Sequence, residues 1–147
     1  MTANENADPL FIDTNALVAL FDEDDHHHQS ATAVFDGIQR GDLRYGPLFT
    51  SRYVLSETAT TMVVGIDHRA AVEALATVSE SPSINVLEVD TALFDRTVSQ
   101  FERYDDHEIS FVDHTNAVLA DEYDIEHIFA FDSDFATLGL QRVPVDV

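Results

Sequence analysis

The chain has 147 residues, of which 45% are hydrophobic, and this length and composition are typical of one globular domain with a real core. Its 28 acidic residues face only 7 bases, all of them arginine, which gives a formal net charge of -21. The absence of lysine excludes a P-loop and Schiff-base chemistry, and the absence of cysteine excludes thiol catalysis, disulfides and thiolate zinc sites.

The acidic residues are spread along the whole chain rather than gathered in a tail. This distribution is typical of halophilic proteins, whose molar cytoplasmic KCl strongly screens charge. An acidic protein that binds a basic partner is the alternative. The N-terminus is polar, and no apolar run is long enough to cross a bilayer, so we expect a cytoplasmic protein without a membrane segment. Residues 1–8 are predicted to be flexible, and residues 9–147 to form one domain.

The first half of the chain is predicted to alternate strands and helices. The expected strands are Pro9–Ile12 and Leu43–Phe49, the second bent at Pro47 or lying at a sheet edge there. The expected helices are Ala16–Phe21, Gln29–Arg40 ending at Gly41, a third from Thr50 or Ser51 to Gly65, and a fourth from Asp67 to Ser81. The acidic turn Asp22–Asp25 is a candidate cap for the second helix.

The second half continues the same alternation. The expected strands are Ile84–Val89, His127–Phe131 and Arg142–Val145. One helix is expected to begin at Asp90 or Thr91, with Leu93, Phe94, Val98 and Phe101 on one face, and another to run from Ser110 to Tyr123. This pattern favours a parallel sheet with helices on both faces, in which ligands bind beyond the carboxyl ends of the strands.

Four acidic residues stand beside apolar stretches, where buried strands or helices begin or end: Asp13, Glu57, Asp113 and Asp132. Burying an unpaired carboxylate is costly, and this chain has too few bases to pair them all. If the fold gathers these side chains, a divalent cation is the natural neutraliser, and such a site can cleave phosphodiester bonds. We hypothesise that the three aspartates supply metal ligands, directly or through water, with Glu57 as a ligand or as a base that orients water.

Each acid also has a purely structural interpretation. Asp13 could cap the helix that follows it, and Glu57 could lie on a solvated helical face. Ser110 and Asp113 have the spacing of a capping box, and residues 132–134 (Asp-Ser-Asp) are typical of a turn. The order of the four acids along the chain is the stronger observation.

That order resembles the PIN-domain family of metal-dependent ribonucleases, and within it the VapC-like toxins of toxin–antitoxin pairs. The likeness extends from about Leu10 to the C-terminus and rests on four segments: Phe11–Leu17, Thr50–Glu57, Ser110–Asp113 and Phe131–Phe135. It implies a three-layer α/β/α sandwich (PIN-like, with a central parallel sheet), RNA as substrate, a Mg²⁺ or Mn²⁺ cofactor and a VapB-like antitoxin as partner. The residues that match the family's acidic positions are Asp13, Glu57, Asp113 and Asp132, with Asp134 as an additional metal-ligand candidate.

Polar residues near these acids are candidates for substrate contacts. Thr14, Asn15 and Ser133 adjoin the acids, although local capping explains them equally well. Arg52 precedes the glutamate in the same helix and is the best candidate for a phosphate contact, with a solvated arginine at a helix start as the alternative. The run His26–His28 suggests a metal site, but consecutive side chains point in different directions, so a polar helix start is favoured.

Three functional interpretations remain open. The first is a toxin endoribonuclease, the second a housekeeping PIN nuclease of RNA processing, and the third a non-catalytic acidic module that docks a basic partner and tolerates Asp→Asn changes. A protein of this charge should repel RNA, although molar salt and bound metal would weaken the repulsion. Apolar residues of the helices at Val54–Val64 or Leu93–Phe101 could serve a homodimer, as the resemblance suggests, but core packing explains them as well.

Overall fold

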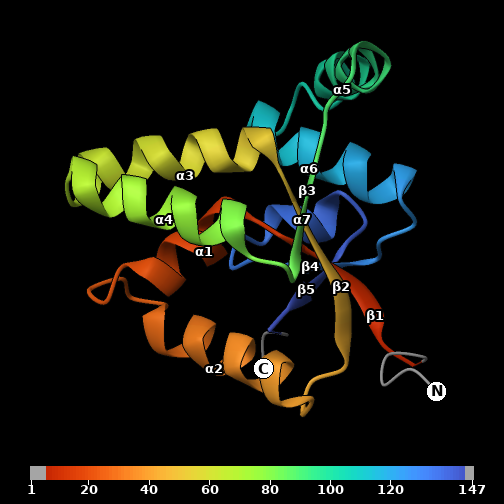
Figure 1. Ribbon diagram of the computed structural model, residues 1–147. Coiled ribbons are helices and arrows are strands. Elements are labelled where there is room, and N and C mark those ends of the chain that lie inside the picture. Colours follow the sequence, from red (N-terminus) through yellow and green to blue (C-terminus); the bar gives the residue numbers. More distant parts are fainter. Residues whose placement is uncertain (1–5, 145–147) are drawn as a thin grey trace.

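The structure is a computed structural model that describes residues 6–144, and its strands and helices alternate along the chain (Figure 1). The strands are β1 (Asp8–Ile12), β2 (Tyr45–Ser51), β3 (Ile84–Leu87), β4 (His127–Phe129) and β5 (Gln141–Val143). The helices are α1 (Thr14–Phe21), α2 (His28–Arg40), α3 (Arg52–Gly65), α4 (His68–Glu80), α5 (Thr91–Arg103), α6 (Phe111–Glu122) and α7 (Asp134–Thr137). Within the described range, no helix has the length and apolar character needed to cross a membrane.

The expected chain ends are only partly described. β1 begins at Asp8, the last residue of the segment that the sequence predicts to be flexible. Residues 1–5 of that segment lie outside the described range, as does Val145, the expected end of the last strand.

All five strands form one parallel sheet in the order β3-β2-β1-β4-β5. Helices cover both of its faces, which gives the three-layer α/β/α sandwich that the sequence predicts; α2 and the α5–α6 pair lie on opposite sides of the sheet in Figure 1. The chain proceeds from β1 to β2 and β3, then returns to the other side of β1 to form β4 and β5. β1 and β4 therefore flank the topological switch point, the place where such sheets bind ligands.

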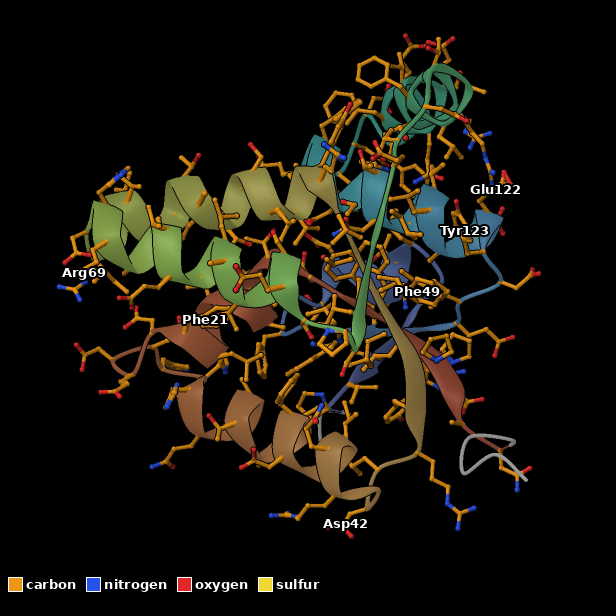
Figure 2. All side chains as sticks on the ribbon, in the orientation of Figure 1. Phe21, Asp42, Phe49, Arg69, Glu122 and Tyr123 are labelled. Atoms are coloured by element: carbon orange, nitrogen blue, oxygen red, sulfur yellow. The ribbon has the colours of Figure 1, made fainter. Side chains whose placement is uncertain are left out.

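The two central strands are apolar on both faces, as expected for strands covered by helices on each side. Phe11 of β1 and Ile128 and Phe129 of β4 are each 0% exposed and belong to one hydrophobic cluster. Figure 2 shows side chains filling the space between sheet and helices, whereas Arg69 and Asp42 project outward at the periphery. This close packing holds the carboxyl ends of β1 and β4 side by side.

Most helix boundaries follow the capping signals of the sequence. Four polar side chains accept a hydrogen bond from the backbone N–H three residues further on, as N-caps do: Ser51, Asp67, Asp90 and Ser110. α2 ends at Gly41, whose φ of 79° lies in the left-handed region that glycine adopts without strain. The acidic turn before α2 does not supply the expected cap, because the N-cap is His27 and makes no side-chain capping bond.

Pro47 lies inside the sheet rather than at its edge, because β2 pairs with β1 on one side and with β3 on the other. The β1–β2 register shifts between the pair Asp8–Tyr45 and the pair Leu10–Leu48. Pairing of β2 with β3 begins only at Leu48. The proline therefore lies at an irregularity of β2, before the pairing with β3 begins and where its missing N–H leaves no ladder bond unmade.

Four features of the C-terminal half differ from expectation. β3 ends at Leu87, two residues earlier than predicted. β4 ends at Phe129, two residues earlier than predicted, so Asp132 lies in the loop beyond the strand. The short helix α7 is not predicted from the sequence. The apolar face expected on α5 is only partly covered, since Phe94 and Phe101 remain 40% and 44% exposed.

Candidate metal centre

Asp13 directly follows β1 and is the N-cap of α1, so the capping interpretation of this residue is confirmed. Its backbone N–H donates to the carbonyl of Phe129 at 3.0 Å, which anchors it at the switch point. The side chain is 2% exposed; Oδ2 accepts from the N–H of Asn15 at 3.4 Å, and Oδ1 accepts from the amide of Asn116 at 3.1 Å. Burial, and then the charge of Asp113, raise the pKa of Asp13 to about 8.

Asp113 lies in the first turn of α6, where its backbone serves the helix cap and its side chain does not. The backbone N–H of Asp113 donates to Oγ of Ser110 at 3.2 Å. Its carboxylate is half-buried and faces the other acids. Burial, followed by the charges of Asp132 and Glu57, raises the pKa of Asp113 to about 7. Capping and participation in an acidic site are thus compatible at this position.

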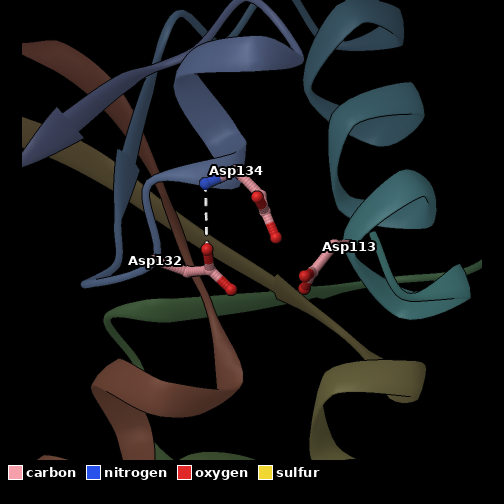
Figure 3. A group of neighbouring side chains, drawn as sticks. All are labelled: Asp113, Asp132 and Asp134. Carbon is pink, nitrogen blue, oxygen red and sulfur yellow. Dashed lines mark hydrogen bonds between the residues drawn. The ribbon is translucent and has the colours of Figure 1, made fainter. Parts of the chain in front are cut away.

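Asp132 and Asp134 complete a tight cluster with Asp113. One carboxylate oxygen from each of the three lies within 4.8 Å of the others. Figure 3 shows the three side chains converging: Asp113 from α6, Asp132 from the loop before α7, and Asp134 from the first position of α7. The backbone N–H of Asp134 donates to Oδ1 of Asp132 at 2.9 Å, which is the turn chemistry that the sequence suggests. Burial, and then the charge of Asp132, raise the pKa of Asp134.

Glu57 reaches the same place from α3, where it is half-buried. Its charge contributes to the raised pKa of both Asp13 and Asp113, so the three carboxylates lie near one another. We refer to Asp13, Glu57, Asp113, Asp132 and Asp134 as the carboxylate group. Three of these acids, Asp113, Asp132 and Asp134, form the tight cluster. Asp13 and Glu57 lie outside that cluster, and only their charge effects on the pKa values of Asp13 and Asp113 connect them with it.

No base neutralises the carboxylate group by an ion pair that the structure shows within residues 6–144. The ion pairs in that range join Arg40, Arg52, Arg69, Arg96 and His107 to other acids. Gathered carboxylates with raised pKa values must bind either protons or a cation. Their ligand atoms are all oxygen, which suits a hard divalent ion such as Mg²⁺ or Mn²⁺.

The candidate substrate residues occupy diverse environments. Thr14 is 2% exposed, and its hydroxyl is buried without a hydrogen-bond partner. Asn15 and Ser133 are exposed beside the carboxylate group. Arg52 is also exposed, and its Nε lies 2.7 Å from a carboxylate oxygen of Glu88. The structure thus places Arg52 in a surface ion pair, from which it would have to be released to contact a phosphate.

Three buried polar residues of α6 have no counterpart in the sequence-based site: His114, Thr115 and Asn116. The hydroxyl of Thr115 donates to the carbonyl of Phe111 in its own helix, whereas the other two reach beyond it. Asn116 is 0% exposed and lies one turn beyond Asp113, where its amide reaches Asp13. His114 is 1% exposed; its Nδ1 lies 2.9 Å from the amide nitrogen of Gln100 in α5, and burial lowers its pKa. A polar residue among the buried positions of a helix is a sign of a functional or structural role. The buried positions of α6 cannot be recognised from the sequence alone, because they depend on the elements that cover this helix.

The fold and this site together define a doubly wound α/β protein with carboxylates gathered at the switch point of a parallel sheet. The family model described as the PIN domain matches residues 10–140. The chain belongs to the PIN domain family. Among curated proteins, no relative matches its sequence significantly.

Solved structures with the same fold include a toxin with substantial sequence identity. VapC20 of Mycobacterium tuberculosis, described as a sarcin-ricin loop cleaving toxin, is 31% identical with a TM-score of 0.80, over 89% of this chain and 95% of that one. VapBC2 from Rickettsia felis, bound to a promoter DNA fragment, is 12% identical (TM-score 0.66; 91% and 96% covered). FitAcB from Neisseria gonorrhoeae is 14% identical (TM-score 0.62; 90% and 95% covered). The last two likenesses concern the fold alone.

Proposed function

We propose that this protein is a metal-dependent endoribonuclease that acts as the toxin of a VapBC-type pair. The observation that carries the proposal is the cluster of Asp113, Asp132 and Asp134 near the buried Asp13, without an ion-paired base among the described residues. Membership of the PIN domain family and the likeness to a VapC toxin support the same activity.

Asp13, Asp113 and Asp132 would hold a Mg²⁺ or Mn²⁺ ion, directly or through water, with Asp134 as a further ligand. Such an ion, when bound, makes a water molecule more acidic and offsets the negative charge of the phosphate. Glu57, half-buried on α3 beside Asp13 and Asp113, would act as a ligand or accept the proton of the attacking water. Hydrolysis then breaks the bond between phosphorus and one ribose oxygen of the RNA.

The residues around the carboxylate group would position the substrate. Arg52 can exchange its exposed partner Glu88 for a phosphate, because surface ion pairs are weak. The exposed side chains of Asn15 and Ser133 are further candidates for contacts with the ribose–phosphate backbone. Thr14 lies below the surface, and its buried, unpartnered hydroxyl would help to position the substrate.

The descriptions of the relatives support a proposal for the substrate and for the partner. VapC20 is described as cleaving the sarcin-ricin loop, so a structured loop of ribosomal RNA is the substrate we propose first. Neighbours solved as VapBC2 and FitAcB support a VapB-like antitoxin as partner. The exposed Phe94 and Phe101 of α5 would then contribute to a homodimer, and the protein would act in the cytoplasm of a halophilic cell.

The decisive experiment measures cleavage of sarcin-ricin loop RNA by the purified protein in molar KCl with Mn²⁺. We expect cleavage that EDTA abolishes and that Asp113→Asn also abolishes, since the variant retains shape but loses a charged ligand. Asp36→Asn, at an exposed position of α2, is the matched control and should cleave as the wild type does. Full activity of a folded Asp113→Asn protein would contradict the site. A folded, metal-loaded wild type that cleaves no RNA would favour a binding module.

A further inference from the structure

A ladder of four aromatic rings extends from the core to the surface beside the carboxylate group. Its inner end is Phe129, which is 0% exposed, followed by the half-buried Phe131 with ring centroids 6.2 Å apart. The ring of His27 stacks on Phe131 at 4.1 Å with an interplanar angle of 3°. The exposed His26 packs edge-on against His27 at 4.4 Å and 74°. The run of histidines is thus part of a defined structure rather than a merely polar helix start.

The position of this ladder connects it with the site. Phe131 immediately precedes Asp132, so the ring that supports His27 belongs to the same loop as two of the carboxylates. The histidines come from the start of α2, more than a hundred residues earlier in the chain. His27 occupies the N-cap position of α2 but forms no side-chain capping bond there. The ring of His27 therefore has no capping role, and Phe131 connects it with the segment that carries Asp132.

The net charge of this chain opposes RNA binding, because a protein at -21 repels a polyanion. Proteins normally bind RNA through lysine and arginine contacts to phosphates, and such binding weakens steeply as salt rises. This chain has no lysine, and four of its seven arginines already contact acids: Arg40, Arg52, Arg69 and Arg96. Stacking of a base on an aromatic ring uses a face that every base has. A ring stack that reaches the surface at His26 suits RNA binding by a protein with a net charge of -21.

We propose that the ring stack of His26, His27 and Phe131 binds a base of a single-stranded RNA segment adjacent to the scissile phosphate. The proposal rests on the proposed ribonuclease function and adds a subsite to it. The outer histidine rings supply the stacking face, and Phe131 holds His27 in the stacked orientation. The contact tolerates any base, so target choice would come from elsewhere in the RNA.

The test measures binding rather than cleavage, in an Asp113→Asn background that leaves the RNA intact. The probe is a short fluorescent oligoadenylate containing one 2-aminopurine, titrated in molar KCl with Mg²⁺. We expect the His26→Ala/His27→Ala variant to bind roughly tenfold more weakly and to lose the quenching of 2-aminopurine that stacking produces. His27→Tyr, which keeps an aromatic ring without an imidazole, should retain both signals. His68→Ala, an exposed histidine on α4, is the matched control.

The outcomes separate this proposal from the proposed function. Equal binding by the wild type and the double variant, or equal loss in His27→Tyr and His27→Ala, would overturn the stack as a base-binding site. The rings would then serve the packing of α2 or a protein partner. If removal of His27 also unfolds the protein, His26→Ala alone decides, because its ring is exposed. Histidine-dependent binding without any cleavage by the wild type would leave the stack in place and contradict only the nuclease.

Discussion

At the scale of single residues, Asn116 orients the most deeply buried carboxylate of the site. Its Nδ2 donates to Oδ1 of Asp13 at 3.1 Å, while Oδ2 of Asp13 receives only the long bond from Asn15. An amide donor in this place holds the carboxylate in one rotamer and leaves its second oxygen free for a cation. The buried Oδ1 of Asn116 has no hydrogen-bond partner, so the burial of this side chain lowers the stability of the fold.

Replacing Asn116 by alanine should therefore weaken Mn²⁺ binding and cleavage by roughly 10- to 100-fold, because partners of metal ligands contribute about that much. Isothermal titration with Mn²⁺ and single-turnover cleavage would measure the two effects. Asn85→Ala is the matched control, since that amide donates to the carbonyl of Leu48 in the sheet, away from the site. An Asn116→Ala protein that loses no more metal affinity than Asn85→Ala would show that the amide does not position Asp13.

The carboxylate group also determines how the stability of the metal-free protein depends on pH. The folded pKa values of about 8 for Asp13 and about 7 for Asp113 exceed the ordinary value of 3.8. Between these limits the native state binds more protons than the unfolded state, so the free energy of unfolding decreases as pH rises. With EDTA in molar KCl, the melting temperature should fall by at least about 5 °C between about pH 5 and pH 8.5.

Two controls distinguish this effect from the general charge of the protein. Asp13→Asn should flatten the pH dependence, whereas Asp36→Asn at an exposed position should preserve it. Mn²⁺ added at the alkaline end should restore the melting temperature, because a bound cation replaces the protons. A metal-free melting temperature that stays constant or rises across this range would contradict the raised pKa values.

The acids of the site could be predicted from the sequence because each one interrupts or borders an apolar segment. Asp13 after Phe11 and Ile12 is the clearest example. Asn116 and His114 could not be predicted in this way, since their burial depends on how α5 and the sheet cover α6. The stacking of His27 on Phe131 could not be predicted either, because the two residues are distant in sequence.

At the scale of elements, α6 presents Asp113 from its first turn, and Ser110 maintains that turn. Ser110→Ala removes the Oγ that accepts from the N–H of Asp113 and should cost about 1 kcal/mol of stability. Fraying of this turn also displaces a carboxylate of the site, so cleavage should fall several-fold. Asp67→Ala removes the corresponding cap of α4, whose bond to Ala70 is 2.8 Å long, and should cost a similar stability.

Urea unfolding and kcat/KM for both variants test this prediction. Similar losses of stability, with a loss of kcat/KM confined to Ser110→Ala, would show that the cap acts on the site through the position of Asp113. Equal kcat/KM values in the two variants would mean that the first turn of α6 stays formed without its cap. Losses of kcat/KM in both would point to a general effect of stability.

The order of strands and helices followed from the sequence because caps and apolar periodicity are local signals. The elements that differ depend on tertiary context. α7 is a single turn, Asp134–Thr137, too short to show any periodicity. β4 stops at Phe129 because its partner β5 ends at the opposite residue, Val143. The expected face of α5 left Phe94 and Phe101 partly exposed, since the helix packs on α6 rather than on the sheet.

At the scale of the whole molecule, the distribution of charge is the dominant feature. The arginine ion pairs involve largely exposed side chains, such as Arg69 with Glu73 and Arg40 with Asp42, and pairs of this kind contribute little. The other acids repel one another across the surface, which opposes the compact state. The carboxylate group adds a second, local repulsion at the switch point. Two different additions should therefore reduce these two repulsions: salt screens the surface charges, and a divalent cation neutralises the carboxylate group.

The stabilisation by salt and the stabilisation by a divalent cation can be measured separately. Raising KCl from about 0.1 M to about 1 M shortens the screening length from roughly 10 to 3 Å, so the melting temperature should rise by at least several degrees in EDTA. NaCl should act equally, because screening does not depend on the identity of the ion. The increment from Mn²⁺ should persist in molar salt and vanish in Asp113→Asn. RNA affinity should stay level or rise with salt, against the usual steep decline, because salt screens the repulsion between RNA and the acidic surface of this protein. A melting temperature that falls with salt would mean that attractive ion pairs outweigh repulsion. An RNA affinity that falls steeply with salt would mean that contacts between arginines and phosphates dominate the binding.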